Sequence, residues 1–251
     1  MIETDHQTQP LGLDELSWVD VAAQLGRDPR LIVPVGALEQ HGPHLPLGTN
    51  VLIARRIAVD LSREFGVLRA PTIYYGVTVR TAASYAGTTT LTQKTFHRSL
   101  NELLAGWEAH GVLEFIIITA HRHEPHLDAL ATLTTRRARV RVVSIWDVDV
   151  GDLLTRQPGP FHAGEAETSL MLFLHPELVR MERARDLDLT DAAFKRYMQG
   201  QLPVPPPGGA GVVGHATAAT AATGEKIYRR LIGAIGDAVF SGRNREDSDT
   251  I

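Results

Sequence analysis

The stretch LIVPVGALEQHGPHLPLGTN, residues 31–50, decides how the rest of the chain is arranged. Residues 31–35 form an apolar run, which predicts a strand covered on both faces of a sheet. Glu39 and His41 follow two positions apart, and in an extended segment such residues point to the same side. A carboxylate and an imidazole that leave a strand end together suit a divalent metal site, but a solvated polar loop has the same composition. A metal site needs three or four ligands, so other segments would have to supply the rest.

Two further segments carry residues of the same kind. Residues 113–119, LEFIIIT, give the strongest strand signal and run directly into His121 and His123, which repeat the two-residue spacing. If the two apolar strands are neighbours, four side chains that can bind a metal converge. Residues 161–170, FHAGEAETSL, open a helix. Glu165 in that helix is equally well explained as a first-turn acid stabilised by the helix dipole.

Strands alternate with helices along the whole chain. This alternation predicts an α/β fold, a three-layer α/β/α sandwich with a mostly parallel central sheet. In open sheets of this kind the ligand site lies at the carboxyl ends of the strands, where the clusters around Glu39 and His121 are expected. Apolar periodicity and Gly, Pro and Thr signals predict helices at residues 14–25, 49–65, 92–110, 125–138, 165–174 and 224–240. Further strands are predicted at residues 67–68, 72–75 and 140–145. Loops are predicted at residues 81–90 and 201–211.

Composition narrows the possible functions. The chain has 251 residues, 43% of them hydrophobic, which fits one domain over residues 1–251 with flexible ends at 1–12 and 241–251. The net charge of −4 without a basic block argues against nucleic acid and against a membrane surface, and we find no apolar run that could span a bilayer and no signal peptide. The absence of cysteine excludes thiolate ligands and is compatible with a cytoplasmic location. Six of the eleven histidines fall in three short stretches, which favours metal chemistry.

Four motifs resemble those of one known family. Residues 36–46 resemble the signature of the creatininase family, the creatinine amidohydrolases, and residues 162–169, HAGEAETS, resemble its His-Ala-Gly-Glu-x-Glu-Thr-Ser segment. Residues 86–91, AGTTTL, resemble the family's Pro-Gly-Thr-Thr-Ser-Leu, and residues 119–121 stand where the family has Asn-Gly-His. The resemblance covers about residues 13–240, and the order and spacing of the motifs agree.

The resemblance implies a two-metal hydrolase with zinc or manganese, in an α/β/α fold that commonly assembles as a hexamer. By position it implies these roles: Glu39 and His121 at one metal, His41 and Glu165 at the other, Asn50 as a bridge between both, and His162 as proton shuttle or, alternatively, as a structural imidazole.

The chain departs from the family pattern at the proposed bridge and in the loop after residue 119. The family has aspartate where this chain has Asn50, and losing a unit charge about 4 Å from each dication costs several kcal/mol even at an effective dielectric of about 20. Arg122 adds bulk where the family has glycine; it could bind a carboxylate or an oxyanion, or lie in solvent. His123 stands where creatininase has a glutamate ligand, so it is a further candidate ligand.

The resemblance also bears on the substrate. Trp146 matches a tryptophan that covers creatinine, but a second such tryptophan has no counterpart in residues 156–158, which argues against creatinine itself. We expect a metal-dependent hydrolase of a non-peptide C–N bond, in a cyclic amide or related small molecule, with metal-activated water as nucleophile and His162 as proton donor. The alternative is a divergent member with a degenerate metal site, acting as a non-hydrolytic biosynthetic enzyme, a ligand-binding protein or an oligomer subunit.

Overall fold

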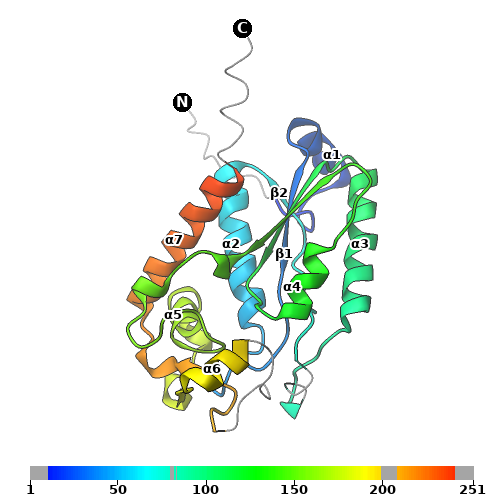
Figure 1. Ribbon diagram of the computed structural model, residues 1–251. Coiled ribbons are helices and arrows are strands. Elements are labelled where there is room, and N and C mark those ends of the chain that lie inside the picture. The colour runs from blue at the N-terminus through cyan, green and yellow to red at the C-terminus, as the bar shows by residue number, and fades with distance from the viewer. Residues whose placement is uncertain (1–10, 80–81, 83, 199–207, 241–251) are drawn as a thin grey trace, which may run out of the picture.

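The computed structural model describes residues 11–79, 82, 84–198 and 208–240. A parallel sheet with the strand order β2-β1-β3-β4 runs through the centre, and helices cover both of its faces (Figure 1). The expected three-layer α/β/α sandwich with a mostly parallel sheet is therefore confirmed. The strands are β1 (Arg30–Val35), β2 (Leu68–Arg69), β3 (Glu114–Thr119) and β4 (Arg139–Ser144), and a separate antiparallel pair joins β5 (Asp186–Leu187) to β6 (Gly214–His215).

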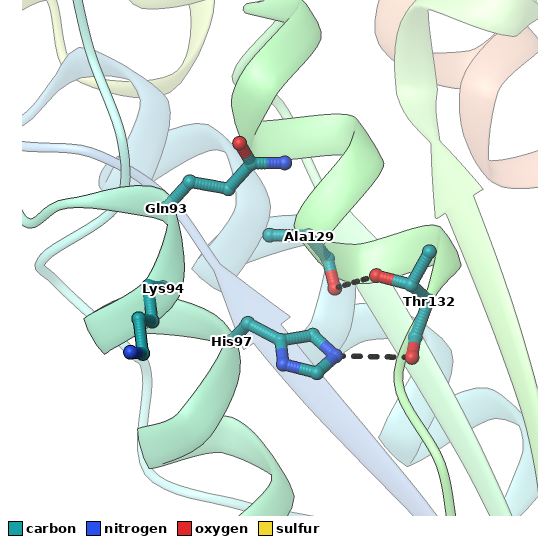
Figure 2. Close-up of a pocket in the computed structure, with 5 residues that line it drawn as sticks. All are labelled: Gln93, Lys94, His97, Ala129 and Thr132. Carbon is teal, nitrogen blue, oxygen red and sulfur yellow. Dashed lines mark hydrogen bonds between the residues drawn. The ribbon is translucent and has the colours of Figure 1, made fainter.

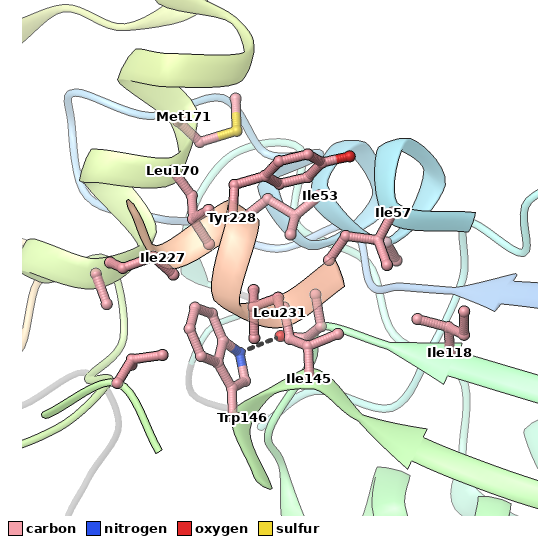
Figure 3. Packing of buried hydrophobic residues seen from close by; sticks show 14 of the residues in the cluster. Ile53, Ile57, Ile118, Ile145, Trp146, Leu170, Met171, Ile227, Tyr228 and Leu231 are labelled. Atoms are coloured by element: carbon pink, nitrogen blue, oxygen red, sulfur yellow. Dashed lines mark hydrogen bonds between the residues drawn. The ribbon is translucent and has the colours of Figure 1, made fainter. Parts of the chain in front are cut away.

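Alternating strand residues divide the core into two halves. Ile32, Ile116 and Ile118 belong to one buried cluster, which includes residues of α2 (Thr49–Phe65), α5 (Glu165–Leu174) and α7 (Ala221–Val239) (Figure 3). Leu31, Val33 and Ile117 belong to the other, with residues of α1 (Trp18–Arg27), α3 (Gln93–Ala109) and α4 (Glu124–Ala131). Because both sheet faces are covered, the central strands need apolar residues at nearly every position.

The register of the sheet brings the polar segments to one edge. Val35 pairs with Thr119, and Thr119 pairs with Ser144, so β1, β3 and β4 end at the same level. The chain segments that follow these three strands therefore leave the sheet side by side. Their position at the carboxyl ends of parallel strands is where open α/β sheets bind ligands.

Some boundaries differ from the expected ones. The first helix begins at Trp18 because Ser17 caps it, with the Asp20 amide donating to the Ser17 hydroxyl. The helix expected over 125–138 ends at Ala131, and the Glu108 carboxylate instead accepts the backbone N–H groups of residues 136–138. In the strand expected at 72–75 only Ile73 pairs, with Val35.

The chain ends and the short elements complete the description. Leu11 and Gly12, expected in the flexible N-terminal arm, lie against Arg69 in a bridge to the sheet. Residues 1–10, 241–251 and most of the loop expected at 201–211 lie outside the described part of the chain. In the part that is described, we find no helix with the length and apolar character needed to cross a membrane. Among the described residues, the α6 helix (Asp191–Met198) and several 3₁₀ turns were not predicted; the turns are Ile145–Asp147, Gly151–Leu153, Pro176–Leu178, Met181–Arg183 and Ala216–Ala218.

Candidate metal centre

Three segments meet at the carboxyl edge of the sheet. Glu39 and His41 come from the chain after β1, His121 from the chain after β3, and His162 from the turn before α5. One ligand atom each of Glu39, His41 and His162 lie within 4.8 Å of one another. The Nδ1 atom of His121 lies 2.9 Å from Glu39 Oε1. Glu39 is therefore the carboxylate around which three imidazoles gather.

The three imidazoles are oriented in the same way. Each uses one ring nitrogen to donate to a backbone carbonyl: His41 Nδ1 to Glu39 O at 3.0 Å, His121 Nε2 to Val77 O at 2.9 Å, and His162 Nε2 to Gln40 O at 2.8 Å. The other nitrogen then faces Glu39 Oε1, at 3.9, 2.9 and 3.9 Å in the same order. Histidines that bind metals are characteristically held in this way, with the outer N–H on a carbonyl and the inner nitrogen free.

His41 gives the clearest indication that a cation belongs here. Its Nε2 atom is buried without a hydrogen-bond partner, 3.9 Å from Glu39 Oε1 and 3.7 Å from Glu167 Oε2. Burial, together with the charge of His162, lowers the pKa of His41 to about 3, so the ring is neutral and Nε2 carries a lone pair. A lone pair that faces two carboxylates is unfavourable unless a cation lies between them. The residues present therefore fit a divalent ion.

Glu39 and His121 form a coupled buried pair. Burial raises the pKa of the Glu39 carboxyl, but His121, His162 and His41 together outweigh burial and hold it well below its usual range. Burial likewise lowers the pKa of His121, and the charge of Glu39 outweighs it, so that the pKa of His121 is raised. A metal ion would therefore compete with a proton for His121 Nδ1.

Asn50 lies on the His121 side of Glu39. It is 1% exposed, in the first turn of α2, and its Nδ2 atom donates to Glu39 Oε1 at 3.0 Å while lying 3.0 Å from His121 Nδ1. Its Oδ1 atom is buried without a partner. Asn50 therefore lies in the cluster, and the group that faces Glu39 is an amide donor; its expected bridging role stays a prediction.

Glu167, and not Glu165, is the acid of α5 that faces His41. Glu165 is fully buried, and its carboxylate accepts the Thr155 amide at 2.7 Å, the Thr155 hydroxyl at 2.8 Å and the Arg156 amide at 3.0 Å. Two positions apart on a helix, the acids point about 200° away from each other, so only one of them can face the cluster. Glu165 thus anchors the chain at residues 155–156 instead of facing the cluster as expected, and Glu167 is the acid of α5 that lies near His41.

Burial controls the state of Glu167. It is 6% exposed, and burial, with the nearby charge of Glu39, raises its pKa to about 7 even though His162 and the Ala163 amide act in the opposite direction. A nearby cation would stabilise the ionised form of this carboxyl, which burial disfavours. The sequence did not distinguish the two acids, because residues 165–171 are buried on every side of α5 and no polar face marks the site.

The remaining expected residues have other surroundings. His123 Nδ1 donates to Val77 O at 3.0 Å, and the pKa of His123 is lowered by burial and by the charge of His121. Arg122 is exposed. Trp146, expected to cover the substrate, is 6% exposed and packs in the core with Ile145 and Leu231, and its ring N–H donates to Ala120 O at 2.7 Å (Figure 3). It thus supports the β3 end that carries His121.

Three supporting residues were not singled out from the sequence. Val77 supplies the carbonyl that orients His121 and His123, Thr78 donates its hydroxyl to Glu39 Oε2, and Gln40 supplies the carbonyl that orients His162. Backbone carbonyls leave no trace in a residue pattern, so only the spatial arrangement identifies them.

A separate surface hollow lies between α3 and α4 (Figure 2). There His97 Nε2 donates to Thr132 O at 3.0 Å, and the Thr132 hydroxyl donates to Ala129 O at 3.4 Å. Its other lining residues are Gln93 and Lys94. None of the five belongs to the cluster around Glu39, and the hollow presents no group of convergent acids and imidazoles, so we do not assign the chemistry to it.

Comparison with known proteins agrees with this geometry. The profile of the Creatininase family, creatinine amidohydrolase, matches residues 14–239. Creatinine amidohydrolase of Pseudomonas putida is 29% identical over 249 residues, which cover 90% of this chain and 94% of that protein. Mycofactocin precursor peptide peptidase of Mycolicibacterium smegmatis is 28% identical, with 84% of each chain covered.

Solved structures share the fold. A crystal structure of creatinine amidohydrolase superposes with a TM-score of 0.77 at 26% identity, covering 92% of this chain and 97% of the other. Two further creatininase structures, described as a Zn-Zn form and as an Mn form, give TM-scores of 0.76 and 0.77 at 26% and 27% identity, with 92% of this chain and 98% of each covered. The cluster around Glu39 and the family profile lead to one conclusion: the chain belongs to the creatinine amidohydrolase (creatininase) family and is a metal-dependent amidohydrolase.

Proposed function

We propose that this protein hydrolyses a C–N bond outside the peptide backbone, in a cyclic amide or a related small molecule, at a centre that holds zinc or manganese. The observation that carries the proposal is the common orientation of His41, His121 and His162, whose inner nitrogens face Glu39 Oε1. Glu39, His41 and Glu167 would hold an ion on one side of the cluster, and His121 would extend the ligand set on the other. Asn50, whose Oδ1 atom has no partner, stays a proposed ligand beside His121. His123 remains a proposed additional ligand.

A divalent ion held there would polarise the scissile carbonyl and lower the pKa of a water molecule. We assign proton transfer to His162, because its side chain is 15% exposed while those of His41 and His121 are 0% and 5% exposed. Its outer N–H is held by Gln40 O, which leaves Nδ1 free to take a proton from the attacking water and pass it to the leaving nitrogen.

The substrate is proposed to be an amide other than creatinine. The named relatives include a creatinine amidohydrolase and a precursor peptide peptidase, so membership of the family leaves the substrate open. In this chain residues 155–158 carry no tryptophan, and the Arg156 side chain is exposed next to the backbone amides that Glu165 holds. Arg122 and Arg156 are the proposed contacts for an anionic group of the substrate, and Trp146 contributes through the core that supports the site.

Metal analysis and a substrate screen test this function. We expect zinc or manganese in the purified protein, amine release from some members of a panel of cyclic ureides, lactams and hydantoins, and loss of both metal and activity in His121→Ala. His97→Ala, a histidine outside the cluster, is the matched control and should retain both. Less than about a tenth of an equivalent of metal after supplementation would reject the proposal, since a buried site of this composition binds its ion tightly.

A second candidate function is favoured by Asn50. An amide N–H on Glu39 Oε1 takes up part of the carboxylate's capacity to bind an ion, which suits a member that binds a ligand or runs a different, non-hydrolytic reaction. Metal binding without turnover of any amide in the screen would support this alternative. The expected homo-oligomer, a hexamer by family likeness, and the expected cytoplasmic location remain predictions, and light scattering tests the first.

A further inference from the structure

A buried histidine outside the ligand set contacts the helix that carries Glu167. His44 is 1% exposed, and its Nε2 atom lies 2.9 Å from the hydroxyl oxygen of Thr168, which is fully buried in α5. Burial lowers the pKa of His44 to about 4, so the ring is neutral. The contact joins the loop after β1 to the residue that follows Glu167, across 124 positions of sequence.

The direction of this hydrogen bond follows from the partners of Thr168. The Thr168 hydroxyl also lies 3.3 Å from the carbonyl oxygen of Ala163, which can only accept. A hydroxyl has one hydrogen to donate, so the Thr168 hydrogen goes to Ala163 O and His44 Nε2–H donates to Thr168. The result is a directed chain from imidazole to hydroxyl to carbonyl.

Ala163 is the residue that this chain of hydrogen bonds holds. Its φ is 55°, a left-handed conformation that residues with a Cβ atom seldom adopt. Its amide donates to Glu167 Oε2 at 2.6 Å, the same oxygen that lies 3.7 Å from His41 Nε2. It also follows His162 directly. An unfavourable turn therefore places both Glu167 and His162, and such a turn persists only where neighbouring groups hold it.

We propose that His44 and Thr168 are positioning residues of the metal centre. They keep the turn at residues 162–164 in the conformation in which Glu167 Oε2 and His162 face His41. This inference rests on the proposed function, since it assumes that Glu167 and His41 hold an ion. Neither residue touches the ligand atoms of the cluster, so both act through Ala163.

Zinc affinity measured against a chromophoric chelator tests this inference. Thr168→Val keeps the shape and removes the hydroxyl, and we expect zinc binding about tenfold weaker or worse, the usual consequence of losing a partner that orients a ligand. Thr168→Ser restores the hydroxyl and should restore the affinity. Ser169→Ala is the matched control: its hydroxyl is equally buried on α5 but accepts the Thr220 amide at 3.1 Å, away from the cluster, so the melting temperature should fall without a change in zinc affinity.

A second variant keeps the test decisive if Thr168→Val folds poorly. His44→Leu should weaken zinc binding to a similar extent, and the double variant should be no weaker than the single ones, because both act through one chain of hydrogen bonds. Wild-type affinity in Thr168→Val or His44→Leu, or additive losses in the double variant, would overturn the positioning role while leaving the proposed function intact. A wild-type protein that binds neither zinc nor manganese would overturn both.

Discussion

Replacing Asn50 by aspartate tests how the centre balances its charges. The new carboxylate would lie about where the Asn50 amide now donates to Glu39 Oε1 at 3.0 Å. Two negative charges at that separation repel each other by about 5 kcal/mol at an effective dielectric of about 20. The variant also loses the amide donor, so Glu39 would keep its hydrogen bonds to Thr78 and His121 alone.

In metal-free buffer we therefore expect the Asn50→Asp protein to be less stable than the wild type. Proton uptake by the pair relieves part of the repulsion, so a loss of roughly 2–4 kcal/mol is a reasonable expectation, and at about 2–4 °C per kcal/mol the melting temperature falls by about 4–16 °C. A divalent ion removes the repulsion, so zinc should raise the melting temperature of the variant more than that of the wild type.

Differential scanning fluorimetry with EDTA and with zinc, together with metal content by mass spectrometry, provides the measurement. Asn101 lies in α3, outside the cluster, and contacts His97. The Asn101→Asp variant therefore controls for the change of one amide to an acid. If Asn50→Asp matches the wild type in EDTA and shows no larger response to zinc, the charge reasoning is refuted. A higher metal content in the variant would show that the native amide limits how many ions the centre holds.

Two further pairs of variants test the site and the packing behind it. Glu167→Gln should lose zinc, because it removes the carboxylate that faces His41. Glu165→Gln should retain zinc and lower the melting temperature, since one amide oxygen cannot accept all of the hydrogen bonds from Thr155 and Arg156. Equal zinc loss in both variants would contradict this assignment. In α7, Gly224→Ala would place a Cβ atom 1.9 Å from Ser169 O and should destabilise the protein by about 1–3 kcal/mol or more. The Cβ atom of Gly233→Ala meets nothing within 4 Å, so this variant should stabilise the protein by about 0.5–1 kcal/mol, and urea unfolding compares the two. A tolerated Gly224→Ala would show that α5 and α7 are less closely packed than the structure indicates.

Much of the architecture could be predicted from local patterns. The helices at Thr49–Phe65 and Glu165–Leu174 have the expected bounds, because apolar spacing, a glycine that ends α2 and a glycine before α5 mark them within a few residues. The apolar runs at residues 31–35 and 113–119 identify the central strands, since a strand covered on both faces has almost no polar positions. The helix expected over 125–138 was too long, because a carboxylate from α3 captures the amides of residues 136–138, and such a contact is not encoded nearby in the chain.

The site, too, was predictable from the sequence in part and depended on the tertiary structure in part. Residue type and spacing at strand ends identified Glu39, His41 and His121 as candidates, and family likeness then gave them a chemical role and added His162. The choice between Glu165 and Glu167, the burial of Trp146 in the core, and the carbonyls that set each imidazole depended on the tertiary structure. A sequence states which groups are present, whereas the rotation of a helix and the partner of each ring nitrogen are settled only when distant segments pack together.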